Sequence, residues 1–218
     1  MLRGSLASLV DPRDERLIHR LEAFSDIVIG FSMALLALDL PSNAADVAGL
    51  VPWLVAFLVS FGFVALLWWL HNRLFAYYFT ATPLTIGLNF AALGGVALFI
   101  FSTTALAHNL LDPTAHVRTM IPFLALWMGL YGTVLLLLAA LYGLGLRARW
   151  TELTDAIKRW GVARALNSGA GGGALLAIGL LLPHLAPGNF VLIMPLAIIS
   201  VLAERLFTTR IVGKAPAV

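Results

Sequence analysis

Six apolar runs, each about 20 residues long, constrain this chain more than any other feature of its sequence. A run of this length crosses about 30 Å of hydrocarbon as a helix. Because a lone strand cannot satisfy its backbone hydrogen bonds in lipid, we expect every run to be helical. The sequence therefore predicts an all-α membrane protein with six transmembrane helices, at about 21–40, 52–71, 84–107, 120–146, 163–182 and 189–207.

The composition leaves no room for a large soluble domain beside these spans. Of the 218 residues, 61% are hydrophobic and 11% are charged, whereas a soluble domain carries about 25% charged residues. We expect residues 1–19 to form a cytoplasmic lead, 20–207 the six-helix domain and 208–218 a cytoplasmic tail. The chain has no cysteine, which excludes disulfides, a thiol nucleophile and a cysteine metal site.

A cleaved signal peptide is the competing interpretation of the first run, with Ser42–Ala44 as a passable cleavage site. Arg20, Glu22 and Asp26 lie too close to the apolar core for that interpretation, and Asp39 ends the core. We therefore treat the run as a membrane span.

The distribution of Lys and Arg predicts the orientation. If the chain crosses the membrane six times, 13 of its 14 basic residues fall in one compartment, and Arg118 alone falls in the other. Loops rich in Lys and Arg stay in the cytoplasm, so both termini are predicted to be cytoplasmic. We expect a multi-pass protein of the cell's inner (plasma) membrane, and the net charge of +3 reflects this topology rather than nucleic-acid binding.

Two stretches in the second half of the chain have structural and functional interpretations. Trp150, Leu153, Ile157 and Trp160 recur at helical spacing among basic residues, which predicts an amphipathic helix on the inner leaflet; a docking site for a regulator is the alternative. The small residues of 168–173 predict close helix packing. A phosphate-binding loop is disfavoured, because no Lys-Ser or Lys-Thr follows the glycines.

The first span presents two surfaces on a helical wheel. A wholly apolar stripe contains Phe24, Ile27, Val28, Phe31, Leu35 and Leu38. Ser25, Ser32 and Asp39 are spaced seven apart and form a narrow polar line beside it. Spacing alone leaves two interpretations: a stripe that faces lipid or neighbouring helices, or a stripe that meets its copies around an axis and forms a hydrophobic constriction.

Polar side chains of three spans are predicted to lie at one depth near the cytoplasmic leaflet. They are Arg20, Ser25, Asp26, His71 and Asn89. Buried polar groups need partners, so these five residues are expected to form one network, although an interfacial position for His71 is the plainer interpretation.

Several of these residues carry a family likeness. Arg20-x-x-x-Phe24-Ser25-Asp26, followed by an apolar helix that ends Leu38-Asp39-Leu40, resembles the transmembrane protein 175 family of lysosomal potassium channels and their bacterial relatives. The stretch from Trp69 to Phe75 is similar to the family's span-two motif Trp-x-x-His-His-x-x-Phe. Leu88-Asn89 and Ser102–Leu106 are similar as well.

The resemblance implies a tetramer assembled around the first span. By the family pattern, Phe31, Leu35 and Leu38 are the constriction layers of the pore. Arg20, Ser25 and Asp26 would anchor the pore helix through His71 and Asn89 rather than bind the ion. The Asp39 residues of the four copies could form a ring of carboxylates that attracts cations. Alternatively, Asp39 is a plain helix-end carboxylate at the interface.

The sequence departs from the family pattern in three places. Ala34 stands where members often have Thr, Phe31 where they have Ile or Leu, and Asn72 where they have a second His. In the family, that Thr is associated with a preference for potassium, and this chain has Ala34 instead. The resemblance therefore implies potassium permeation without fixing a selectivity ratio.

The leading hypothesis is a potassium-permeable, passive, tetrameric cation channel that is not an enzyme and needs no cofactor beyond the permeant K⁺. Its partners would be its own copies and the lipid bilayer, and no other protein partner is inferable. The alternative is a secondary transporter, proton-coupled or not, but the later spans offer almost no polar site at the midplane. The five histidines are scattered, which disfavours an enzyme; His108 and His116, which share a loop with Asp112, are a weak candidate metal site.

Overall fold

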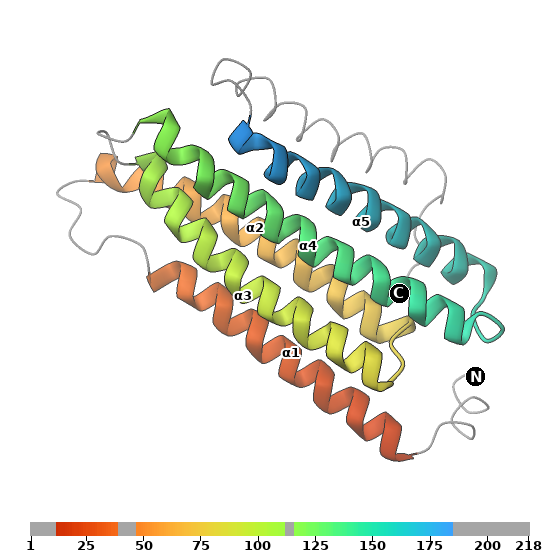
Figure 1. Ribbon diagram of the computed structural model, residues 1–218. Coiled ribbons are helices and arrows are strands. Elements are labelled where there is room, and N and C mark those ends of the chain that lie inside the picture. The colour runs from red at the N-terminus through yellow and green to blue at the C-terminus, as the bar shows by residue number, and fades with distance from the viewer. Residues whose placement is uncertain (1–11, 39–46, 112–115, 185–218) are drawn as a thin grey trace.

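The computed structural model describes residues 12–38, 47–111 and 116–184 (Figure 1). All regular elements in these ranges are helices. They are α1 (Pro12–Leu38), α2 (Val47–Tyr77), α3 (Pro83–Leu111), α4 (Val117–Arg149), α5 (Asp155–Leu181) and the short 3₁₀ helix η1 (Leu182–His184).

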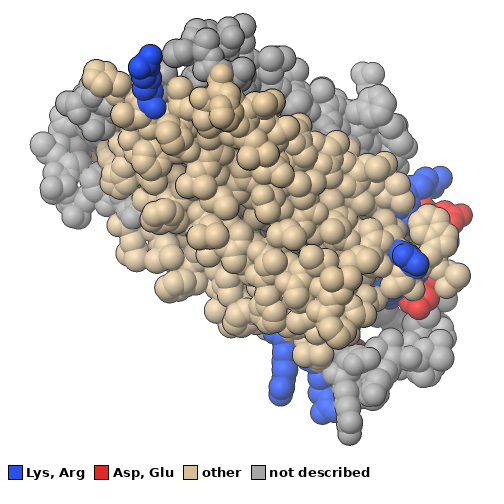
Figure 2. All heavy atoms as spheres, in the orientation of Figure 1, with Lys and Arg blue, Asp and Glu red and all other residues tan. Residues whose placement is uncertain are grey.

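Five of these helices, α1 to α5, are long and apolar enough to cross a membrane. On the face that Figure 2 shows, charged side chains gather toward the ends of the bundle and leave an uncharged band between them. The prediction of an all-helical membrane protein is confirmed for these five spans. The sixth predicted span (189–207) and the tail (208–218) lie outside the described residues, as do residues 1–11 of the lead.

The helices are longer than the apolar runs that predicted them. Residues 12–19, assigned to the lead, form the first two turns of α1. The expected start of the second helix at Pro52 is wrong, since α2 begins at Val47 and has Pro52 in its second turn. The length of an apolar run indicates only the part of the helix that lies in lipid. The helices themselves extend beyond that part.

The expected surface helix between the fourth and fifth spans is also absent. Helix α4 continues to Arg149, and α5 begins at Asp155, well before the predicted residue 163. The side chain of Thr154 accepts a hydrogen bond from the backbone N–H of Ile157 and so caps α5. Leu153 and Trp160 are buried in the bundle, so their helical spacing reflects packing rather than contact with the leaflet.

Glycines allow α4 and α5 to pack closely along their length. A Cβ atom on Gly172 would lie 2.7 Å from the Gly132 carbonyl oxygen, and one on Gly179 would lie 2.8 Å from the Ala125 carbonyl oxygen. This confirms close helix packing at Gly172 in the predicted stretch 168–173, whereas the Cβ position of Gly173 meets no atom within 4 Å. Helix α4 also packs on α3, whereas α1 packs against α2 and α3 at the other side of the bundle (Figure 1).

A reciprocal pair of threonines closes the short turn between α2 and α3. The Thr82 hydroxyl accepts from the backbone N–H of Thr85, and the Thr85 hydroxyl accepts from the backbone N–H of Thr82. Pro83 occupies the first helical position, where its missing N–H costs nothing. This capping box fixes how the chain enters α3 and therefore where Asn89 lies relative to α2.

Candidate functional site

Helix α1 divides into a buried side and an exposed side. Its buried positions recur every three or four residues and face α2 and α3; they are Leu21, Ser25, Ile29, Ser32 and Leu36. The large exposed side chains of its membrane-spanning part are all apolar: Phe24, Ile27, Phe31, Leu35 and Leu38. In a membrane-spanning helix such a face meets lipid or another protein, and this one carries the predicted constriction residues, so we take the exposed apolar face of α1 as the candidate functional site.

The three predicted constriction residues lie on this face. Phe31 is 65% exposed, Leu35 is 40% exposed and Leu38 is 78% exposed in the single chain. The polar line that competed with them turns inward, since Ser25 is fully buried and Ser32 is 4% exposed. Asp39, the candidate mouth residue, lies outside the described residues.

A buried polar relay holds the opposite side of α1. His71 of α2 and Asn89 of α3 share a hydrogen bond of 2.7 Å between Nε2 and Oδ1. The Asn89 Nδ2 group donates to the Ser25 hydroxyl at 3.3 Å, and that hydroxyl donates to the Leu21 carbonyl oxygen at 2.7 Å. The structure thus brings together three of the five predicted network residues from three helices.

The direction of these bonds follows from the chemistry of each group. The Asn89 Oδ1 atom can accept but not donate, so His71 must carry its proton on Nε2. The Asn89 amide then donates to a lone pair of Ser25, whose own proton goes to Leu21. His71 donates, Asn89 and Ser25 each accept and donate, and Leu21 accepts, so each bond joins a donor to an acceptor, as a stabilising buried network requires.

The other two predicted network residues lie apart from this relay. The half-buried Asp26 carboxylate accepts a hydrogen bond of 2.9 Å from the indole Nε1 of Trp68 on α2. Arg20 is exposed, and within the described ranges no hydrogen bond or ion pair joins it to the relay. Trp68 was missed from the sequence because Trp at a span end is ordinarily an interfacial residue; its N–H at the depth of Asp26 was the available signal.

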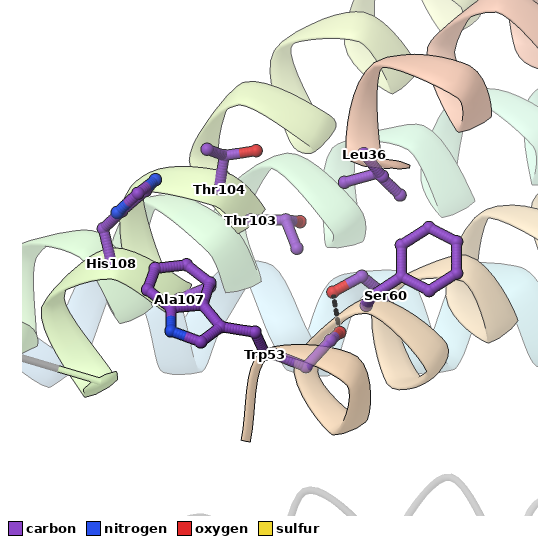
Figure 3. A pocket seen from close by; sticks show the side chains of 9 residues that line it. Leu36, Trp53, Ser60, Thr103, Thr104, Ala107 and His108 are labelled. Atoms are coloured by element: carbon purple, nitrogen blue, oxygen red, sulfur yellow. Dashed lines mark hydrogen bonds between the residues drawn. The ribbon is translucent and has the colours of Figure 1, made fainter. Parts of the chain in front are cut away.

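At the opposite end of α1, a small cavity of about 30 Å³ lies between α1, α2 and α3. Leu36, Ser60, Thr103 and His108 are among its lining residues, and the Trp53 ring meets the His108 ring edge-on at 4.8 Å (Figure 3). The Ser60 hydroxyl donates to the Ala56 carbonyl oxygen of its own helix (Figure 3).

The candidate metal site near this end gains no support from the described residues. His116 is exposed, and its carbonyl oxygen accepts from Thr119 at the start of α4. No group of three or more metal-ligating side chains occurs in the described part of the chain. Asp112, the third member of the suggested site, lies outside it.

Fold and site together define an all-helical, multi-span membrane protein whose first helix keeps an apolar face uncovered. Comparison with known proteins then specifies the family it resembles. Residues 20–99 match the family model of the endosomal/lysosomal potassium channel TMEM175. The suspected resemblance is confirmed, and the matching family is one of potassium channels rather than enzymes.

A solved structure shares the fold over most of the chain. It is the crystal structure of a lysosomal potassium-selective channel TMEM175 homolog from Chamaesiphon minutus, with a TM-score of 0.63 and 22% sequence identity. The match covers 87% of this chain and 98% of that one. The search of curated protein sequences finds no match.

Proposed function

We propose that this chain is a potassium-permeable cation channel that conducts passively. One observation carries the proposal: α1 leaves a continuous apolar face uncovered while a hydrogen-bonded relay fixes its other side. The family match over residues 20–99 covers both the relay and this face.

In this proposal four copies assemble with their α1 helices around a common axis. The exposed side chains of Phe31, Leu35 and Leu38 would meet there as successive apolar rings. Such rings control permeation through the hydration of the path, because a narrow apolar constriction empties of water. Phe31 is the bulkiest of the three and would form the tightest ring.

The proposal also covers the remainder of the architecture. Residues 189–207 would supply a sixth span, which places both termini in the cytoplasm and leaves the protein in the inner (plasma) membrane. Conduction down a gradient needs no cofactor, and the permeant ion is K⁺. Asp39 would stand at the end of the path opposite the relay.

A flux assay in liposomes tests this function. Purified protein should release K⁺ down its gradient without an energy source, and replacing K⁺ by Na⁺ or by a large organic cation measures its preference. Flux that required a counter-ion or saturated with one substrate would identify a carrier instead. Protein-free liposomes supply the background.

The mass of the protein in mild detergent tests the assembly separately. Four copies of the 23.4 kDa chain are expected in the particle, as measured by light scattering with the detergent contribution subtracted. A stable monomer that still conducted would contradict the shared pore.

A further inference from the structure

We propose that Tyr142 is a positioning residue for the first helix, because its hydroxyl fixes the peptide group that carries His71. Tyr142 lies on α4 and is fully buried. Its hydroxyl donates a hydrogen bond of 2.7 Å to the Leu70 carbonyl oxygen on α2. That oxygen belongs to the planar peptide group joining Leu70 to His71, so the bond acts directly on the backbone of His71.

From His71 the constraint reaches α1 through the relay. The His71–Asn89 bond of 2.7 Å leads from α2 to α3, and the Asn89–Ser25 bond of 3.3 Å leads from α3 to α1. Tyr142, His71, Asn89 and Ser25 are each 3% exposed or less. Water therefore does not compete for these bonds, and a change at one end is passed to the next member.

Close packing keeps the hydroxyl in place. Gly145 lies one turn after Tyr142 on the same side of α4, and a Cβ atom there would collide with the backbone of Tyr78, the residue that follows α2. The Tyr142 ring also packs on Tyr78 at 5.2 Å and on Trp160 at 6.0 Å between ring centroids. Helix α4 is thus packed closely one turn beyond Tyr142, which limits the movement of the Tyr142 ring.

A matched control lies nearby. The Tyr78 hydroxyl donates to the Ile157 carbonyl oxygen at the same distance of 2.7 Å, but that carbonyl is on α5. Burial raises the pKa of the Tyr78 hydroxyl further above neutral, so it keeps its proton and donates. Tyr142→Phe and Tyr78→Phe each delete one hydroxyl–carbonyl bond and keep the ring, but only Tyr142→Phe deletes a bond to the peptide group that carries His71.

The experiment is a pair of double-mutant cycles on the full chain in detergent, each with Asn89→Leu. Each Tyr→Phe variant alone should lower the melting temperature by about 2–4 °C. In the Asn89→Leu background, the shift from Tyr142→Phe should shrink, because the relay it supports is already broken. The shift from Tyr78→Phe should be unchanged.

Potassium flux in liposomes is the second measurement, and here the inference rests on the proposed function. Tyr142→Phe should change the flux and Tyr78→Phe should leave it as in the wild type. Additive melting shifts in both cycles, or equal flux changes in both variants, would overturn the inference. If the wild-type chain passes no K⁺, the proposed function fails, and the melting cycles still decide the role of Tyr142.

Discussion

At the scale of single residues, side chains that are close in the sequence of α1 face opposite sides of the helix. Ser25 and Ser32 face inward, and Phe31 and Leu35 face outward, although all four lie within three turns. A serine hydroxyl can satisfy itself on a carbonyl of the preceding turn, as Ser25 does on Leu21. The serines therefore tolerate burial, which leaves the large apolar side chains on the free face.

Replacing Phe31 or Leu35 by Ala should increase K⁺ flux, because a wider ring holds water more readily. A barrier lower by about 1 kcal/mol would raise the flux roughly fivefold. The measurement is K⁺ release from liposomes at equal protein content. Leu166→Ala is the matched control, since Leu166 of α5 is 67% exposed and apolar but lies on another helix; an equal gain in that variant would count against the α1 pore.

Asn89→Leu should destabilise the protein, because it leaves the His71 Nε2 proton without its acceptor and Ser25 without its donor. A buried polar group that loses its partner costs about 1–3 kcal/mol. Thermal unfolding in detergent measures this loss. The control is Asn109→Leu, whose amide donates to Ala105 of its own helix and to no other described residue; comparable losses in the two variants would argue against a special role for the relay.

At the scale of helices, α4 and α5 form the closest pair in the described bundle, and their backbones approach through glycines. Gly132, Gly172 and Gly179 lie where a side chain would meet backbone atoms of the partner helix. Small residues are the means by which membrane helices approach closely, since lipid provides no hydrophobic drive for association.

Gly172→Val should disrupt this contact, because its Cβ would lie 2.7 Å from the Gly132 carbonyl oxygen and 3.0 Å from the Leu135 Cβ atom. Overpacking of this kind costs about 1–3 kcal/mol, which thermal unfolding would detect. Gly173→Val is the control, because no atom lies within 4 Å of a Cβ at the next position. If Gly173→Val proved the more harmful substitution, the α4–α5 packing would be misassigned.

At the scale of the whole molecule, the absence of cysteine makes the proposed assembly directly testable. A single Leu35→Cys substitution on the exposed face of α1 should give covalent dimers with a short thiol-specific cross-linker in the membrane. Leu166→Cys, on the exposed face of α5, should give few. Electrophoresis without reducing agent reads both, and cross-linking confined to Leu166→Cys would place α1 away from the axis.

The parts of the architecture predictable from the sequence were those set by hydrophobic length and by a local motif. The apolar runs placed α1 to α5, and the Phe24–Asp26 motif indicated the helix that carries the candidate functional face. The ends of the helices were harder to predict. Thr154 caps α5 within a stretch whose residue spacing also fitted a helix on the membrane surface. The bonds of Trp68 and Tyr142 join residues 42 and 72 positions apart, which local patterns cannot pair.

The relay has a consequence for the order in which the protein is built. Ser25 leaves the ribosome long before Asn89, its partner 64 residues later. Until α3 has entered the membrane, α1 is oriented only by its contacts with α2, such as the hydrogen bond from Trp68 to Asp26. The relay that completes the orientation of α1 therefore forms only after α3 is inserted, and errors in inserting α3 would appear as misrotation of α1.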